Sequence, residues 1–398
     1  MNARLFLRAL AVCPVLGSGT AWSQSVRVRT VPEEYRHIQD AIDSSANGDT
    51  VLVSPGRYYE NINYRGKDIV VTSRYSTTGD VNDIVNTTID GSRPRYPDSA
   101  SVVLITSPGQ GHPVLEGFTI TGGTGTAWRD ARNGGTYREG GGILSEFASP
   151  RIIHNIIVGN EALLAGGVVR SAGGGAIRCG NGEPEIIDNA IIGNRGGYGG
   201  AMVLYYTAAT VKNNVIAHNV GGYSFGGGAI WIAARLARNS PNVLENNTIA
   251  DNTAAGDSSG IVDTSKVADE NGRGGAILVY AGRTYQNDVI LRKNIIWRNS
   301  QRIGGAIAGD TAAVHVSYSD VQGGWRGRGN ISADPLFVDA TRYRLSLHSP
   351  GIDAADTKSA PGEVEDPAGR SHARGAAGPK VHSEMGAYGG RDAHILLP

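Results

Sequence analysis

The sequence has almost no cysteine. Of its 398 residues only Cys13 and Cys179 are cysteines, and Cys13 falls in an N-terminal leader. The mature chain would keep a single cysteine, which can form no internal disulfide. A scaffold held together by disulfides is therefore excluded, and stability has to come from packing.

The chain also lacks an excess of charge and a long apolar run. Lysine plus arginine and aspartate plus glutamate number 37 each, so no overall field attracts nucleic acid or an anionic membrane surface. The apolar stretch from Leu5 to Leu16 is interrupted by Arg8 and Pro14, and it falls short of the roughly 20 residues that a spanning helix needs. We expect no nucleic acid partner and no membrane span.

Residues 1–23 have the features of a signal peptide. Arg4 and Arg8 give a positive start, and Ala21-Trp22-Ser23 places small residues at the two positions that a signal peptidase reads. We therefore predict cleavage before Gln24 and a secreted or periplasmic location. An N-terminal membrane anchor is the alternative interpretation.

What the sequence does contain is abundant glycine, 57 residues, and an internal repeat. One pattern reads aliphatic-x-x-Asn-x-Ile-x-x-Asn, and a Gly-Gly pair followed by two small or apolar residues alternates with it. The first pattern occurs at Ile152–Asn160, Ile186–Asn194, Val211–Asn219, Leu244–Asn252 and Leu291–Asn299. The second occurs at Gly141–Leu144, Gly174–Ile177, Gly199–Met202, Gly227–Ile230, Gly274–Ile277 and Gly304–Ile307.

Each repeat is typical of one coil of stacked strands. In the shortest copy we predict strands over Ala201–Tyr205, Thr210–Lys212 and Val215–Ala217, with a sharp turn at Asn213-Asn214. Asparagine tolerates the left-handed backbone region, and stacked asparagines can form an amide ladder. The prediction is an all-β parallel β-helix. A propeller or sandwich is the alternative, but it would need more short hairpin turns than the spacing provides.

Both ends fit this solenoid. Tyr35–Ser45 predicts an amphipathic helix that caps the stack, with Ile38, Ala41 and Ile42 on its apolar face. The first strands are predicted at Thr50–Val53, Asp68–Thr72 and Thr87–Ile89. We divide the chain into a signal peptide (1–23), a β-helix with its cap (24–330) and a C-terminal cap or tail region (331–398).

These motifs also carry a family resemblance. The stretch IQDAIDSSANGDTVLVSPGRYYENI resembles the opening of bacterial proteins with the pectate-lyase-like right-handed parallel β-helix, and the N-x-I-x-x-N coils resemble the repeats of that group. The tail, with ADPLFVDATRYRLSLHSPGIDAAD, DPAGR and EMGAYGG, is similar to the choice-of-anchor group. The resemblance implies the fold but no particular chemistry, since one fold hosts many activities. No sorting segment follows Gly390, so we expect a free protein.

The loop lengths indicate where a site would lie. The connections Thr124–Gly140 and Thr253–Arg273 are long, and all such insertions enter at the same corner of the coil. They would wall a trough whose floor is the outward row of the first strands. That row is predicted to hold Ser145, Arg178, Val203, Trp231, Leu278 and Ala308, with Tyr205 and Tyr280 in the next row.

The candidate site follows from this trough. Exposed aromatics can stack on sugar rings, and arginines bind carboxylates with two parallel hydrogen bonds. The predicted substrate-binding residues are Trp231, Tyr280, Arg129, Arg138, Tyr137 and Tyr223. The predicted catalytic residues are Arg178, Tyr205, Asp130 and Asp257. Arg178 could instead form an ion pair with Glu146 or with a carboxylate of the wall, and Trp231, Tyr205 and Tyr280 could simply pack under a loop.

Two classes of function remain open, and the first is an enzyme that acts on a polysaccharide. A polysaccharide lyase would use Arg178 with Tyr205 or a loop arginine, whereas a hydrolase would set Asp130 or Glu139 against Asp257 or Asp263. A uronate epimerase has the same needs as a lyase. The other class is a non-catalytic surface or matrix protein that binds glycan or protein, and a floor with one charged residue favours it. The expected partner is a polysaccharide or cell-surface glycan, and we expect a monomer. No motif points to a cofactor, and Ca²⁺ is the one ion left open.

Overall fold

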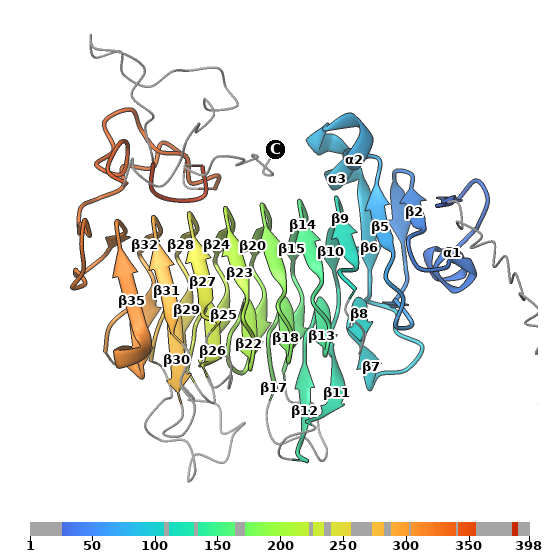
Figure 1. Cartoon of the computed structure of the whole chain (residues 1–398), viewed down its shortest axis with the longest axis horizontal. Coiled ribbons are helices and arrows are strands. Elements are labelled where there is room, and N and C mark those ends of the chain that lie inside the picture. The colour runs from blue at the N-terminus through green and yellow to red at the C-terminus, as the bar shows by residue number, and fades with distance from the viewer. Residues whose placement is uncertain are drawn as a thin grey trace, which may run out of the picture.

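The computed structural model is a stack of β-coils (Figure 1). It describes residues 26–106, 111–130, 134–163, 172–222, 226–234, 240–255, 273–281, 288–301, 304–339, 341–355 and 384–388. Over these residues the strands form five sheets, named A to E, and every strand pair in sheets A, B, C and E is parallel. A complete coil passes through C, A, B and E in turn, as the pairings of consecutive coils show. The predicted right-handed parallel β-helix is confirmed.

The three long sheets run the length of the stack. Sheet A contains β1 (Val28–Val31), β2 (Thr50–Val53), β5 (Val70–Ser73), β9 (Val114–Glu116), β14 (Arg151–Ile153), β19 (Glu185–Ile187), β23 (Thr210–Lys212), β27 (Asn242–Glu245), β31 (Val289–Arg292) and β35 (Val314–Ser317). Sheet B contains β3 (Gly56–Tyr58), β6 (Thr87–Asp90), β10 (Thr119–Thr121), β15 (Ile156–Val158), β20 (Ala190–Ile192), β24 (Val215–Ala217), β28 (Thr248–Ala250), β32 (Ile295–Trp297) and β36 (Asp320–Val321). Sheet C contains β4 (Ile62–Asn63), β8 (Val103–Thr106), β13 (Ile143–Glu146), β18 (Ile177–Gly180), β22 (Met202–Tyr205), β26 (Ile230–Ala234), β30 (Ile277–Ala281) and β34 (Ile307–Gly309).

The remaining elements are short. Sheet E contains β16 (Glu161–Ala162), β21 (Arg195–Gly196), β25 (Val220–Gly221), β29 (Thr253–Ala254) and β33 (Ser300–Gln301). Sheet D contains β7 (Ser99–Ala100), β11 (Gly125–Arg129), β12 (Thr136–Glu139) and β17 (Ala172–Gly173), and β11 and β12 form an antiparallel hairpin. The helices are α1 (Ile38–Ser44), α2 (Tyr75–Thr78), α3 (Val81–Asn86) and a 3-10 turn, η2 (Thr311–Ala313).

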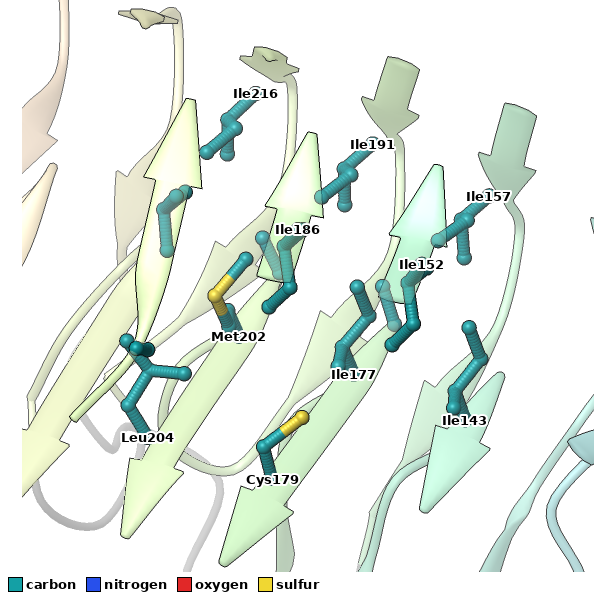
Figure 2. Close-up of a cluster of buried hydrophobic side chains, with 14 of the residues drawn as sticks. Ile143, Ile152, Ile157, Ile177, Cys179, Ile186, Ile191, Met202, Leu204 and Ile216 are labelled. Carbon is teal, nitrogen blue, oxygen red and sulfur yellow. The ribbon is translucent and has the colours of Figure 1, made fainter. Parts of the chain in front are cut away.

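The interior is filled by aliphatic side chains from three sheets (Figure 2). Sheet A contributes Ile152 and Ile186, and sheet B contributes Ile157, Ile191 and Ile216; all five are fully buried. Each such side chain contributes about 1.5–3 kcal/mol through its removal from water. The predicted inward row of sheet C is also confirmed, because the following residues lie in register: Ile143, Ile177, Met202, Ile230, Ile277 and Ile307.

The asparagines of the repeat form two ladders inside the turns on either side of sheet B. In one ladder Asn189 Nδ2 donates to Asn214 Oδ1 at 3.0 Å, and Asn214 Nδ2 donates to Asn247 Oδ1 at 2.9 Å. In the other, Asn194 donates to Asn219 in the same way at 3.0 Å. The predicted amide ladder is confirmed. Each amide also binds backbone carbonyl groups at the turn, so it satisfies polar groups that water cannot reach.

The predicted sharp turn at Asn213-Asn214 is present, but only one of its two asparagines is left-handed. The left-handed residue of each turn is the one before the asparagine, for example Asp188 with φ 54° and Asn213 with φ 56°. The ladder asparagine itself is absent from the positive-φ residues. The turn therefore uses one residue for the bend and the next for the hydrogen bonds.

The Gly-Gly pairs have a steric cause at the corner before sheet C. Gly174 is left-handed, with φ 67°. A Cβ on Gly175 would collide with the carbonyl oxygen of Gly200 in the next coil. Since neighbouring coils stack backbone on backbone here, only glycine fits.

The N-terminal cap is present, with α1 covering that end of the stack (Figure 1). It is shorter than predicted, but Ile38, Ala41 and Ile42 are buried as expected. Glu60 accepts the backbone N–H groups of Ile38 and Gln39 at 3.0 Å each, so it caps the helix from outside. The short helices α2 and α3, inserted between β5 and β6, were not predicted.

The C-terminal region packs along the side of the stack. Tyr343 and Ala387 lie with Val215, Ala217 and Ala250, which belong to β24 and β28 of sheet B. Gly386 donates its N–H to the carbonyl oxygen of Lys293 at 2.8 Å. At the end of the stack Trp325 packs against the interior cluster, and Ile331 forms a parallel bridge with Asp320 of β36.

One buried carboxyl in the last coil predicts a pH-dependent stability. Asp320 is fully buried, and this burial raises its pKa to about 6. A raised pKa means that the folded state favours the neutral carboxyl. The contribution of Asp320 to folding stability is therefore fully present below pH 4 and is lost as pH rises through 6. In urea titrations above pH 6, we expect the free energy of unfolding of Asp320→Asn to exceed that of the wild type by on the order of 2 kcal/mol. Near pH 4 the two values should be equal. If the variant and the wild type had the same urea midpoint above pH 6 as well as near pH 4, this prediction would be wrong.

Candidate functional site

The outward row of sheet C is the predicted floor of the site. Residues in register along it are Leu144, Arg178, Val203, Trp231, Leu278 and Ala308. The prediction of Ser145 in this row was wrong by one position, because Ser145 is in register with Cys179 and Leu204, which point into the interior. Tyr205 and Tyr280 flank Ala233 in the next row, as predicted.

This row is not an open trough. Trp231 is 7% exposed, Arg178 is 1% exposed, and Val203 and Leu278 are fully buried. Trp231, Val203 and Leu278 form an outer cluster with Tyr198, and Tyr205, Tyr206 and Tyr280 pack at its edge. The prediction of an exposed tryptophan platform was therefore wrong, because aromatic side chains from neighbouring coils cover the row.

Arg178 is held between two carboxylates. Its Nε lies 2.8 Å from Glu139 Oε2, and its Nη1 forms an ion pair with Glu146. Both glutamates are buried, at 5% and 1% exposure. The alternative that we left open, an ion pair with Glu146 or a wall carboxylate, is what the structure shows. A doubly paired guanidinium keeps its proton, so this position suits a cation that holds charges in place better than it suits a base.

Two glycines make room for this cluster. A Cβ on Gly180 would strike both the guanidinium of Arg178 and the carboxylate of Glu146. A Cβ on Gly173 would lie 2.6 Å from the ring of Tyr198. Tyr198 in turn donates its hydroxyl proton to Glu139. Sequence reasoning missed Tyr198, although its place directly before the Gly-Gly corner at Gly199 was a usable signal.

Tyr205 and Asp130, two of the predicted catalytic residues, meet in the structure. Asp130 directly follows β11 of the hairpin and is 6% exposed. Burial, and then a hydrogen bond to Asp130, raise the pKa of Tyr205 far above its usual value. The phenol therefore stays protonated at neutral pH and gives up its proton only to a strongly basic oxygen.

Aromatic contacts hold Tyr205 in place. Its ring stacks on Trp231 at 6.4 Å between centroids, and Tyr206 meets it edge-on at 4.6 Å. Tyr280 stacks on the same tryptophan at 6.1 Å. Arg178 Cζ is 5.5 Å from the Tyr205 ring centroid, so the ion-paired cation and the phenol belong to one cluster. Tyr205 and Tyr280 keep part of their surface exposed, so this margin is where a ligand could reach the cluster.

The other predicted residues have different positions. Arg138 is 8% exposed and pairs with Asp98 at 2.8 Å, so it ties down a loop and does not face a ligand, contrary to the prediction. Tyr137 is half-buried opposite Trp128 within the hairpin. Arg129 is exposed at the end of β11. Asp257 and Tyr223 lie outside the described residues.

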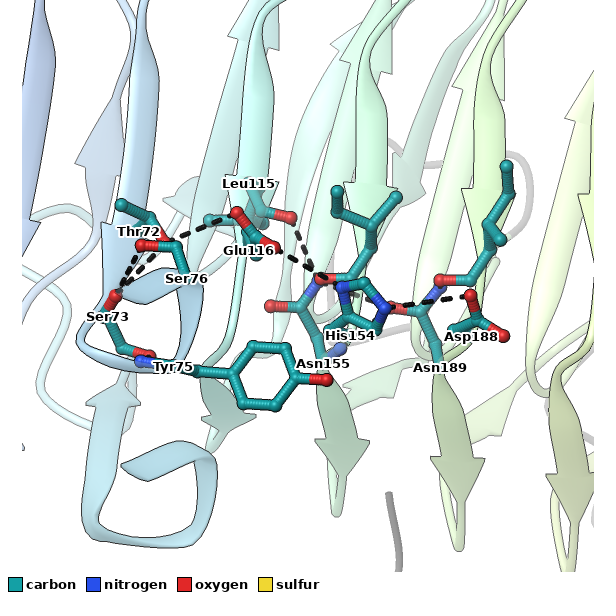
Figure 3. Close-up of polar contacts among 12 residues, drawn as sticks. Thr72, Ser73, Tyr75, Ser76, Leu115, Glu116, His154, Asn155, Asp188 and Asn189 are labelled. Atoms are coloured by element: carbon teal, nitrogen blue, oxygen red, sulfur yellow. Dashed lines mark hydrogen bonds and ion pairs between the residues drawn. The ribbon is translucent and has the colours of Figure 1, made fainter. Parts of the chain in front are cut away.

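A second ionisable cluster lies on the opposite side of the stack, where α2 meets the turns after sheet A (Figure 3). His154 Nδ1 is 3.3 Å from Glu116 and its Nε2 is 3.6 Å from Asp188. Tyr75 of α2 packs on the imidazole with 5.0 Å between the ring centroids. Burial, and then the two carboxylates, raise the pKa of Tyr75 to about 12. These contacts fasten α2 to the coils.

Neither cluster is arranged so that its described residues could hold a metal ion. Among the described residues no group of three or more histidine, cysteine, aspartate or glutamate side chains could hold a metal ion. In that same part of the chain no helix is long and apolar enough to cross a membrane.

Comparison with known proteins gives structural likenesses only. No family model matches the sequence, and no curated protein matches it. Solved structures that resemble the chain include a pectin methylesterase in complex with a hexasaccharide (10% identity, 80% of this chain and 95% of that chain, TM-score 0.43). Others are the pectate lyase Pel9A (12%, 91% and 96%, TM-score 0.39) and an alginate lyase from Paenibacillus (14%, 77% and 96%, TM-score 0.37). Likenesses at this level assign no activity, and the resemblance of the tail to the choice-of-anchor group stays a prediction.

Proposed function

We propose that the protein is a secreted or periplasmic enzyme that processes an extracellular polysaccharide on the outer face of sheet C. One observation carries the proposal: the hairpin β11–β12 brings Asp130 and Glu139 onto strands that carry Arg178 and Tyr205. An enzyme needs at least two titratable groups near one sugar linkage, whereas a binding module needs only aromatic and polar groups. Sequence alone offered one charged residue on this floor, and the tertiary structure adds three carboxylates.

Buried ionisable groups on an outward face are costly unless they are paired, and such clusters concentrate at functional sites. Here they do not belong to the interior of the solenoid, which is aliphatic. The folding of the coils does not by itself bring Glu139 to Arg178 or Asp130 to Tyr205. A functional reason accounts for their meeting better than a structural one.

The roles follow from protonation. Tyr205, protonated and partly exposed, donates a proton to the leaving glycosidic oxygen. Asp130, its hydrogen-bond partner, accepts a proton, from the sugar carbon beside a carboxylate in a lyase or from water in a hydrolase. Arg178 with Glu139 and Glu146 positions the tyrosine ring and does not itself touch the substrate.

The test is turnover of a panel of acidic and neutral polysaccharides by the mature protein. New unsaturated ends, followed by absorbance, identify a lyase, and new reducing ends without them identify a hydrolase. We expect Tyr205→Phe to lower turnover about 100-fold, the lower range for loss of a general acid. Tyr343→Phe is the matched control, because Tyr343 also donates to a carboxylate, Asp251 at 2.7 Å, but on the side of sheet B.

Unchanged turnover in Tyr205→Phe would remove the assigned acid. If no polysaccharide is cleaved but some retard the protein in gels, the enzyme proposal is wrong. The protein would then be a non-catalytic glycan-binding solenoid.

A further inference from the structure

An exposed surface near the N-terminal end of the stack pairs arginines with tyrosine rings. Arg93 Cζ lies 3.8 Å from the ring centroid of Tyr59, and Arg95 Cζ lies 5.3 Å from that of Tyr96. Tyr59 is 44% exposed and Tyr96 is 61% exposed, so both rings remain largely open to solvent. We call these four residues the Arg–Tyr surface.

The charges of this surface are uncompensated. The ion pairs found among the described residues include neither Arg93 nor Arg95. Several other exposed arginines of the stack are paired, for example Arg151 with Glu185 at 2.9 Å and Arg292 with Glu245 at 3.0 Å. Arg93 and Arg95 thus place two exposed cations on one loop, two residues apart.

The stacking prepares both groups for a ligand. A guanidinium over a ring gains about 0.5–1 kcal/mol at an exposed site, and it loses part of its rotational freedom before any ligand arrives. Its N–H edge stays free and fits a carboxylate with two parallel hydrogen bonds. The exposed tyrosine rings offer apolar faces to the C–H faces of sugars.

The Arg–Tyr surface leads into the candidate site. The loop continues into β7, which pairs antiparallel with β11 of the hairpin, and Ala127 donates its N–H to the carbonyl oxygen of Asp98 at 2.9 Å. Arg129, the last residue of β11, is exposed. The next residue, Asp130, reaches Tyr205. The loop that carries Arg93 and Arg95 is thus joined through β7 to the hairpin whose Asp130 binds the proposed proton donor.

We propose that the Arg–Tyr surface, together with Arg129, is an anchoring site for an acidic polysaccharide, separate from the reacting cluster. Carboxylates of successive sugars bind the guanidinium edges while the rings pack on tyrosine. The proposal rests on the proposed function for its ligand, a polysaccharide. It goes beyond that function in assigning a second site and a charged substrate class.

Affinity electrophoresis tests this with the full chain in gels that contain polygalacturonate, or dextran as a neutral glycan. We expect polygalacturonate alone to retard the protein. Arg93→Gln with Arg95→Gln should raise the dissociation constant at least 10-fold, and 0.5 M salt should weaken binding because exposed charges are screened. The control is Arg151→Gln with Arg292→Gln, which removes two exposed, ion-paired charges elsewhere and should leave binding unchanged.

Three results would overturn the proposal: no retardation by polygalacturonate, an equal loss in the control pair, or equally tight binding of single-stranded DNA, which would indicate a generic cationic patch. Tyr205→Phe separates the two proposals. It should lower turnover about 100-fold and keep the retardation, so failure of one proposal is visible without failure of the other. Circular dichroism of each variant checks that the β-helix is intact.

Discussion

Replacing Arg178 with methionine is expected to lower the free energy of unfolding by about 3–5 kcal/mol at pH 7, the range for breaking a buried ion pair. The substitution leaves Glu139 and Glu146 as buried carboxylates without a cation. Urea denaturation followed by circular dichroism measures the loss.

The design has a rescue and a control. Adding Glu139→Gln and Glu146→Gln to the methionine variant removes the uncompensated charge and should restore most of the lost stability. Arg151→Met breaks an exposed ion pair with Glu185 and should cost less than about 1 kcal/mol. A loss below 1 kcal/mol for Arg178→Met would show that the pair carries little of the cluster's stability. A failed rescue would show that shape, not charge, is responsible.

Asn214→Ala should be as damaging, for a different reason. The Asn214 side chain donates to Ile186 O at 2.8 Å and to Asn247 Oδ1 at 2.9 Å, and it accepts the backbone N–H of Asn189 at 2.9 Å. All of these groups are buried, so alanine leaves several donors and acceptors unpaired at roughly 1–3 kcal/mol each. We expect a loss on the order of 3–5 kcal/mol in urea denaturation.

The position along the ladder supplies the control. Asn299 ends its ladder, is partly exposed, and donates to Ile249 O and Trp297 O. Water can replace part of what it loses, so Asn299→Ala should cost about 1 kcal/mol. Hydrogen exchange should show Asn214→Ala deprotecting the adjacent coils first, because a solenoid couples nearest neighbours. Equal losses at Asn214 and Asn299 would contradict a role for burial.

The repeat was readable because its period is local. Asn189 and Asn214 recur at fixed spacing from the aliphatic residues that point inward, and stacking turns that spacing directly into register. The strands predicted at Thr210–Lys212 and Val215–Ala217 are β23 and β24. The strands of sheet E, such as β25, were not predicted, because two residues are too few to show a periodic pattern.

The errors came from contacts between coils. Trp231 points outward as the alternation required, yet Tyr198 and Tyr205 from the preceding coil cover it. Exposure depends on what neighbouring coils place over a residue, and strand alternation contains no such information. Arg138 was misjudged for the same reason, since its partner Asp98 lies 40 residues earlier in the chain.

The sequence by itself determined the solenoid, its aliphatic interior, its ladders and its helical cap, because each of these depends on side-chain type at a repeated local spacing. Only the tertiary structure decided that Asp130 and Glu139 fold back on a hairpin to reach Tyr205 and Arg178. The physical reason is that an insertion obeys no repeat. The path of this hairpin depends on contacts between residues far apart in the sequence, such as the buried ion pair of Glu139 with Arg178.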